Sequence, residues 1–309
     1  MTKGDSMKKM IVIMTSLIGL ASCASLRGAP PPTWPIPEGI KTVEVNGYHM
    51  AYQDTGDGIS LVLLHSHPAD YRTWDTLIPD ISKKYRTIAV SLRHYYPEKW
   101  DGVGDDFSVA QHASDVAAMI KKLKLGRVHL LGNSRGGSIA VTVAGLYPEV
   151  IRTLILEEPN LVPLMPETPE KQKLIAEAKA RGQRVRGNLV TGGREKAARE
   201  WAASWGADWE KLPERSKQVA LDNIGTITES GESERGQFKC ADIQKFNFPI
   251  LLVSGEKSQK IYSDMIAAMR QCKTDIPVPI IVPKGGHAMM HRQNPEFFNK
   301  VLLDFLKQH

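Results

Sequence analysis

The sequence predicts an α/β fold with a mostly parallel central sheet, helices on both faces and an inserted helical cap. Short apolar runs of the length of buried strands recur along the chain and alternate with helical patterns, which is the order that gives parallel strands between two helical layers. Between about Glu158 and Pro249 the strand-like runs stop and helical patterns take over. The strand-like runs are Leu61–Leu64, Thr87–Val90, Val128–Leu131, Thr153–Leu156, Ile250–Val253 and Val278–Val282.

The first residues have the pattern of an export signal. Lys8 and Lys9 precede Met10–Leu20, an apolar run too short to span a bilayer. Leu20-Ala21-Ser22-Cys23 follows directly and resembles the bacterial lipoprotein box. The resemblance implies that residues 1–22 are removed, that Cys23 is lipidated, and that the protein is anchored at the periplasmic face of the outer membrane. The alternative is an ordinary signal peptide followed by an incidental cysteine.

A proline-rich segment and a hairpin follow this leader. Residues 23–40 contain five prolines and are predicted to form a stiff tether. Thr42 to Tyr52 then alternates around Asn46-Gly47, which is typical of a type I′ hairpin turn. Further along, Ser108 and Gln111 have the spacing of a capping box at the start of a helix.

A helical cap is predicted between the two halves of the sheet domain. Thr168-Pro169-Glu170 is a helix start, and Gly182 is the expected end of that helix. A second helix is expected from about residue 194 to 205, and a third near Pro213. The predicted domains are a core of residues 41–158 and 240–309 and a cap of residues 159–239.

Charge excludes some functions. The 309-residue chain has a formal net charge of +6 but no Lys/Arg run with interleaved aromatics, so nucleic acid is not an expected partner. Most charges between residues 171 and 199 are basic, which usually marks a solvated helix face. Contact with an anionic lipid or an anionic substrate is the alternative.

The strongest functional signal is Gly132-Asn133-Ser134-Arg135-Gly136, a G-x-S-x-G motif directly after a strand-like run and before a helical pattern. In this context the serine lies on a sharp turn that projects its hydroxyl above the sheet, and the glycines let neighbouring backbone pass close by. The motif and its setting resemble the α/β-hydrolase superfamily, from about Thr42 to the C-terminus. The resemblance implies a serine hydrolase with Ser134 as nucleophile.

The same resemblance locates the two backbone N–H groups of an oxyanion hole. One belongs to Arg135, at the N-terminus of the helix that follows Ser134. The other follows the superfamily's His-Gly pair after the third strand. Here the chain reads His65-Ser66-His67, so the donor would be His67, and Ser66 replaces the usual glycine. His65 is expected to have a structural role.

His287 is the predicted general base, since Gly285-Gly286-His287 follows the last strand in the superfamily's way. The superfamily's acid commonly follows the seventh strand, where this chain has Ser258 instead of aspartate. A minority of members carries the acid after the sixth strand, where Glu158 stands twenty-four positions after Ser134. Glu158 is therefore the predicted acid, with Glu157 as the near alternative, because strand neighbours point to opposite sides.

A serine nucleophile excludes the epoxide-hydrolase and haloalkane-dehalogenase mechanism, which requires a carboxylate. We expect a monomer that cleaves an ester or lactone of a small apolar or aromatic substrate through an acyl-enzyme, without metal or cofactor. Trp74, Tyr95 and Trp201 are candidates for the pocket wall. Alternatives are a C–C bond hydrolase, a cofactor-free perhydrolase or haloperoxidase, and a binding module without turnover.

Two further cysteines are candidates for a disulfide. Cys240 precedes the seventh strand, and Cys272 lies near the end of the helix that returns antiparallel to it. Thiols tend to oxidise outside the cytoplasm, so an exported protein would favour the bridge.

Overall fold

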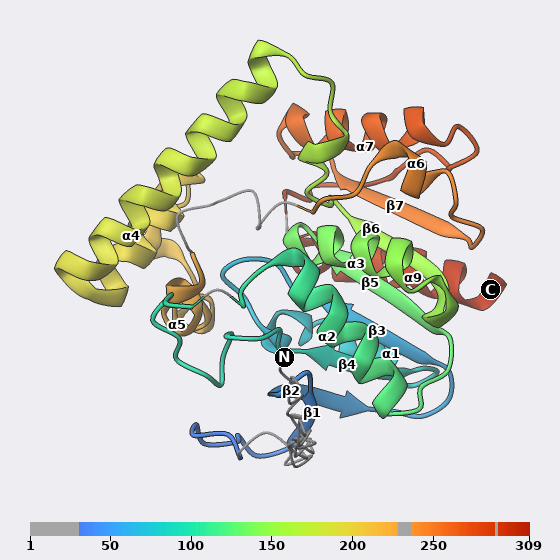
Figure 1. The fold of residues 1–309 in the computed structure, drawn as a ribbon, viewed down its shortest axis with the longest axis horizontal. Coiled ribbons are helices and arrows are strands. Elements are labelled where there is room, and N and C mark those ends of the chain that lie inside the picture. Colours follow the sequence, from blue (N-terminus) through green and yellow to red (C-terminus); the bar gives the residue numbers. More distant parts are fainter. Residues whose placement is uncertain (1–30, 105, 228–235, 288–289) are drawn as a thin grey trace, which may run out of the picture.

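Eight strands form one sheet in the order β1-β2-β4-β3-β5-β6-β7-β8, in which only β2 runs antiparallel to its neighbours, β1 and β4 (Figure 1). Asn46 and Gly47 turn the β1–β2 hairpin with φ of 48° and 73°, as a type I′ turn requires. The strands are β1 (Ile40–Val45), β2 (Tyr48–Thr55), β3 (Ser60–Leu64), β4 (Arg86–Val90), β5 (Val128–Asn133), β6 (Ile151–Glu157), β7 (Ile250–Gly255) and β8 (Ile280–Val282).

This computed structural model describes residues 31–104, 106–227, 236–287 and 290–309. The predicted signal peptide and Cys23 lie outside the described residues. Within those described ranges, no helix is both long enough and apolar enough to traverse a lipid bilayer.

Helices cover both faces of the sheet, as predicted. Alternate side chains of β3 point to opposite faces of the sheet and belong to two separate hydrophobic cores. Val62 and Leu64 lie in the core that includes residues of α2, α3, α6 and α7. Leu61 and Leu63 lie in the core that includes residues of α1, α8 and α9. Figure 1 shows α2 and α3 in front of the strands and α9 behind them. The helices are α1 (Ile78–Ile81), α2 (Val109–Lys122), α3 (Arg135–Leu146), α6 (Cys240–Ile243), α7 (Lys260–Cys272), α8 (Met290–Gln293) and α9 (Pro295–Gln308).

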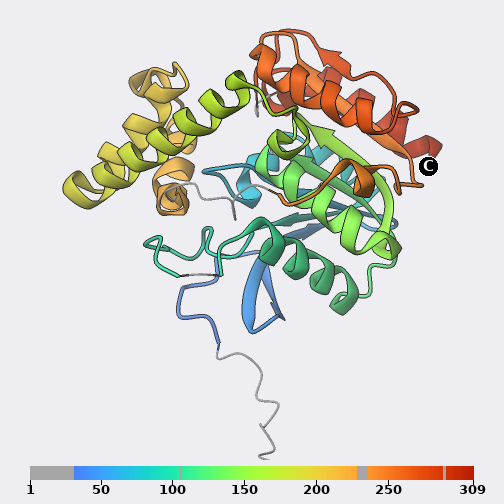
Figure 2. The same cartoon turned by 45° about the horizontal axis from the view of Figure 1, so that its top comes forward.

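The segment between β6 and β7 is helical and extends away from the sheet (Figures 1 and 2). It consists of α4 (Pro169–Ser204), α5 (Glu214–Asn223) and short 3-10 turns, and it has a small apolar core of its own around Val185, Ala198 and Ile224. The predicted insertion of a helical cap into the sheet domain is confirmed.

One predicted helix boundary is wrong. Gly182 does not end the first cap helix, because it is buried within α4 and keeps a helical backbone. The break comes at Gly193, whose φ of 76° and ψ of −175° are open mainly to glycine. Both glycines can adopt this backbone conformation, but Gly182 is buried within the helix and remains helical.

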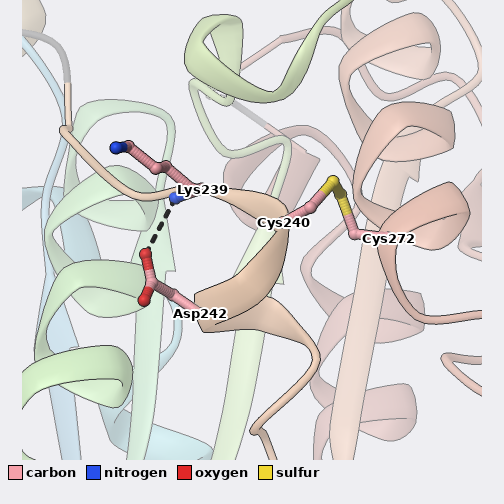
Figure 3. The surroundings of a disulfide bond; sticks show 4 residues. All are labelled: Lys239, Cys240, Asp242 and Cys272. Carbon is pink, nitrogen blue, oxygen red and sulfur yellow. Dashed lines mark hydrogen bonds between the residues drawn. A yellow bond between two sulfur atoms is a disulfide. The ribbon is translucent and has the colours of Figure 1, made fainter.

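Cys240 and Cys272 form the predicted disulfide, which ties α6 to α7 across a Cα–Cα distance of 4.9 Å (Figure 3). Next to it, the backbone N–H of Lys239 donates to Asp242 Oδ2 at 2.9 Å and caps α6. The bridge therefore fixes both ends of the segment that contains β7.

Candidate active site

Ser134 lies on the sharp turn between β5 and α3. Its backbone has φ of 49° and ψ of −112°, a strained conformation for a residue with a side chain. A Cβ atom on Gly132 would collide with the carbonyl of Gly136, and one on Gly136 would collide with the carbonyl of Leu64. The turn therefore requires glycine at both ends of the motif, and it places the Ser134 hydroxyl at the carboxyl edge of the sheet.

Three side chains from distant parts of the chain meet in one hydrogen-bonded line. His287 Nε2 lies 3.1 Å from Ser134 Oγ, and His287 Nδ1 lies 2.8 Å from Glu158 Oε2. An ionised carboxylate only accepts hydrogen bonds, so Nδ1 carries the proton of a neutral imidazole. That leaves Nε2 unprotonated and able to accept the proton of the Ser134 hydroxyl.

Glu158 is held directly after β6 by its neighbours on β7. Its backbone has a positive φ of 41°, and its N–H donates to the carbonyl of Val253. The carboxylate oxygen that does not face His287 accepts from the Ser254 hydroxyl at 2.7 Å and the Gly255 N–H at 2.8 Å. Burial acts to raise the pKa of Glu158, but the hydrogen bonds from His287, Gly255 and Ser254 outweigh it and the pKa is lowered. Glu158 is therefore an anion at neutral pH.

The other acids near the seventh strand point elsewhere. Glu256 accepts from the backbone N–H of Lys284 at 2.7 Å, and Asp264 lies on α7, where it pairs with Lys260. Neither carboxylate contacts His287 in the described structure.

Glu157 forms a second Glu–His pair on the opposite side of β6. Its two carboxylate oxygens each lie 2.9 Å from His291 Nδ1, and both side chains are fully buried. His291 Nε2 donates to the carbonyl of Thr73 at 3.2 Å. His291 therefore has a structural role that joins α8 to β6, which its sequence position did not indicate.

The backbone N–H groups of His67 and Arg135, the two predicted oxyanion donors, have no acceptor among the described residues. Ser66, which stands where glycine was expected, does not have a positive φ, so its side chain introduces no backbone strain. His65 is fully buried and structural, since its Nδ1 donates to the carbonyl of Ser66 and its Nε2 accepts from the N–H of Leu92.

The sequence profile of the α/β hydrolase fold matches residues 59–291. The chain belongs to this family. A Bacillus subtilis protein provisionally named 2-succinyl-6-hydroxy-2,4-cyclohexadiene-1-carboxylate synthase is 25% identical over 84% of this chain and 96% of its own length. The 2-(acetamidomethylene)succinate hydrolase of Mesorhizobium japonicum is 23% identical over 86% and 94%. A thermophilic esterase from Thermogutta terrifontis superposes with a TM-score of 0.67 at 23% identity, covering 87% and 97%. The likeness to the solved structure shows the shared fold.

Two of the predicted pocket residues of this α/β hydrolase lie in its interior. Trp74 is fully buried and packs against the His291 ring at a centroid distance of 4.6 Å, so it belongs to the core beneath the sheet. Tyr95 is also buried. Its hydroxyl contacts Nδ1 of His67, the residue whose backbone N–H is an expected oxyanion donor, at 2.7 Å. The presence of an aromatic side chain alone therefore does not distinguish a core residue from a pocket residue. Trp201 lies in the cap, partly buried against its apolar core and 5.6 Å from the Trp205 ring.

Tyr262 is a site residue that the sequence did not indicate. Its ring, on α7, stacks on the His287 imidazole at a centroid distance of 3.5 Å and an angle of 8°. The stack restricts rotation of His287 about its line to Glu158 and Ser134. Tyr262 lies on the buried side of an amphipathic helix, where an aromatic residue is ordinary, so the sequence did not indicate its contact with His287.

Arg135 is also unusual. Its guanidinium is buried, Nη1 donates to His112 Nδ1 at 2.9 Å, and Nε and Nη2 have no partner in the described structure. Burial and the charge of Arg135 hold the pKa of His67 and His112 well below the usual value, so both rings are neutral.

Proposed function

We propose that the protein is a serine hydrolase that cleaves an ester or lactone of a small apolar or aromatic substrate through an acyl-enzyme. The observation that carries the proposal is the line from Ser134 through His287 to Glu158, with contacts of 3.1 and 2.8 Å. The unpartnered N–H groups of His67 and Arg135 support it, because they provide two donors for a developing oxyanion.

The geometry supports a specific sequence of proton transfers. Ser134 Oγ attacks the carbonyl carbon while its proton passes to His287 Nε2, and the charge on the carbonyl oxygen is stabilised by the two N–H groups. Glu158 stabilises the imidazolium, which then protonates the leaving oxygen. Water then gives a proton to His287 Nε2 as it attacks the acyl-serine, and the imidazolium returns that proton to Ser134 Oγ as the acyl–oxygen bond breaks and the acid is released. Tyr262 acts as a positioning residue for the imidazole throughout.

A fluorophosphonate probe followed by an ester and lactone panel tests the proposal. The purified domain should be labelled on Ser134, and S134A and H287A should lose both labelling and turnover. Labelling without turnover of any ester or lactone would contradict the proposed substrate class. Absence of labelling at Ser134 in the folded protein would contradict the proposed nucleophile.

We also propose that the protein is exported and anchored through a lipid on Cys23. The lipoprotein-box resemblance at residues 20–23 carries this proposal. The Cys240–Cys272 disulfide supports it, because structural disulfides persist in oxidising compartments. One acyl chain binds a membrane weakly and two bind it stably, so the diacylglycerol of a lipoprotein would retain the enzyme at the membrane.

A further inference from the structure

Arg181 of α4 is a cationic side chain without an acceptor. Its guanidinium carbon lies 4.3 Å from the Trp205 ring centroid and 5.8 Å from that of Trp201. No carboxylate, carbonyl or hydroxyl within the described ranges accepts a hydrogen bond from it. Every other cap arginine among the described residues donates to or pairs with a protein oxygen: Arg184, Arg186, Arg194, Arg199 and Arg215.

Two aromatic side chains, Trp205 and Tyr262, lie near both Arg181 and the His287 imidazole. The Trp205 ring on which Arg181 stacks lies 6.3 Å from the His287 imidazole. Tyr262, which covers one face of the same imidazole, is close enough to Arg181 for the two groups to interact electrostatically. The Tyr262 hydroxyl also has no hydrogen-bond acceptor among the described residues. Two donors without acceptors therefore lie in the neighbourhood of the predicted general base: Tyr262 is in contact with its ring, and Arg181 lies across the Trp205 ring from it.

The surroundings of Arg181 favour an anionic ligand. Burial lowers the pKa of Arg181, which shows that withdrawal from water disfavours its charge. A partly withdrawn cation without a hydrogen-bond acceptor costs free energy. The charge of Glu177, one turn away on α4, reduces that cost, and an anion that binds to the guanidinium offsets it further. Stacking on indole fixes the guanidinium plane and leaves its N–H groups available at the edge, where they match the two oxygens of a carboxylate.

The place of the anion on the substrate follows from the proton transfers. His287 must protonate the leaving oxygen, so the leaving group lies beside His287, while the carbonyl oxygen faces His67 and Arg135. Tyr262 contacts His287, and Arg181 lies near Tyr262 and Trp205, so a group that extends from the leaving oxygen past His287 would approach both. We propose that Arg181, with the Tyr262 hydroxyl, binds a carboxylate on the leaving group and so selects esters of carboxylate-bearing alcohols or phenols. This inference rests on the proposed ester hydrolysis.

Kinetics with a matched pair of esters test the subsite. The probes are 4-acetoxybenzoate and its neutral analogue 4-acetoxybenzamide, assayed with wild type, R181Q and K179Q. Lys179 is an exposed residue two positions away on α4, so K179Q removes the same charge outside the site. R181Q should lower kcat/KM for 4-acetoxybenzoate by roughly tenfold or more, the value of a charge-assisted hydrogen bond, mainly through KM.

Under the proposal, R181Q leaves turnover of 4-acetoxybenzamide within about twofold of wild type, and K179Q leaves both esters unchanged. Equal losses on both esters, or equal losses in R181Q and K179Q, would overturn it. So would a loss confined to phenyl hydrogen succinate, whose carboxylate lies on the acyl side.

Calorimetry with 4-hydroxybenzoate separates this inference from the proposed function. The wild-type protein should bind 4-hydroxybenzoate more tightly than 4-hydroxybenzamide, and R181Q should lose that preference. This result without turnover of any ester would retain the carboxylate subsite and reject ester hydrolysis. Turnover with no carboxylate preference in either assay would reject the subsite alone.

Discussion

Replacing Glu158 by glutamine should separate catalysis from folding. The glutamine has nearly the same shape, and its amide oxygen can still accept from Ser254 and Gly255. Its NH₂ group then faces His287 Nδ1, which favours the tautomer that carries the proton on Nε2 and cannot accept from Ser134. In the best-studied triad, this error of tautomer costs about 10⁴ in kcat, which corresponds to about 5.5 kcal/mol.

E158Q should therefore lower kcat by about 10⁴ with little change in KM, because the acid acts mainly in the transition state. Steady-state kinetics on the best ester of the panel measure the first effect, and a thermal melt tests that the variant remains folded.

E157Q is the matched control, since the adjacent side chain points to the other side of β6. It should keep kcat within a few-fold of wild type. It should nevertheless lower the free energy of unfolding by about 1–3 kcal/mol, because His291 loses a charged partner in a fully buried site. A crippled E157Q beside an active E158Q would refute the assignment of the acid. If both variants remain active, the triad requires neither carboxylate and the reasoning fails.

Three further predictions concern stability and processing. Burial lowers the pKa of His65 from 6.5 to about 4, so as the pH falls the unfolded chain takes up this proton before the folded protein does. Between those two pKa values, the free energy of unfolding should fall by up to about 1.4 kcal/mol for each pH unit of acidification. H65Q should show a shallower pH slope in urea unfolding, and an identical slope would exclude this role. The bridge between Cys240 and Cys272 spans 32 residues, so C240A/C272A should lose about 2–4 kcal/mol of stability, and an unchanged urea midpoint would contradict this. Mass spectrometry of the membrane fraction should find a diacylglyceryl group on Cys23, and an unlipidated soluble protein would remove the basis for anchoring.

Much of this architecture could be predicted from local pattern. Strands buried on both faces are continuous apolar runs, and the G-x-S-x-G turn fixed the position of Ser134 at the end of one of them. The choice of Glu158 over Glu157 depended on strand register, and the structure brings Glu158 to His287. The disulfide likewise follows from the positions of its cysteines, Cys240 just before the seventh strand and Cys272 at the end of the helix that follows it.

The features that pattern missed depend on packing between distant segments. Gly193 rather than Gly182 breaks α4 because the cap helices fold back at that point. Trp74 could not be separated from a pocket aromatic, since both kinds are large and apolar. Likewise, nothing local distinguishes His291 or Tyr262, because their partners lie on other elements.

Trapping the acyl-enzyme tests the central claim most directly. Acid quench of the wild-type protein during turnover of an activated ester, followed by peptide mass mapping, should find one acyl group on Ser134. H287A should accumulate none. Turnover by S134A, turnover by the wild type without acylation of Ser134, or an acyl group on another residue would contradict the account.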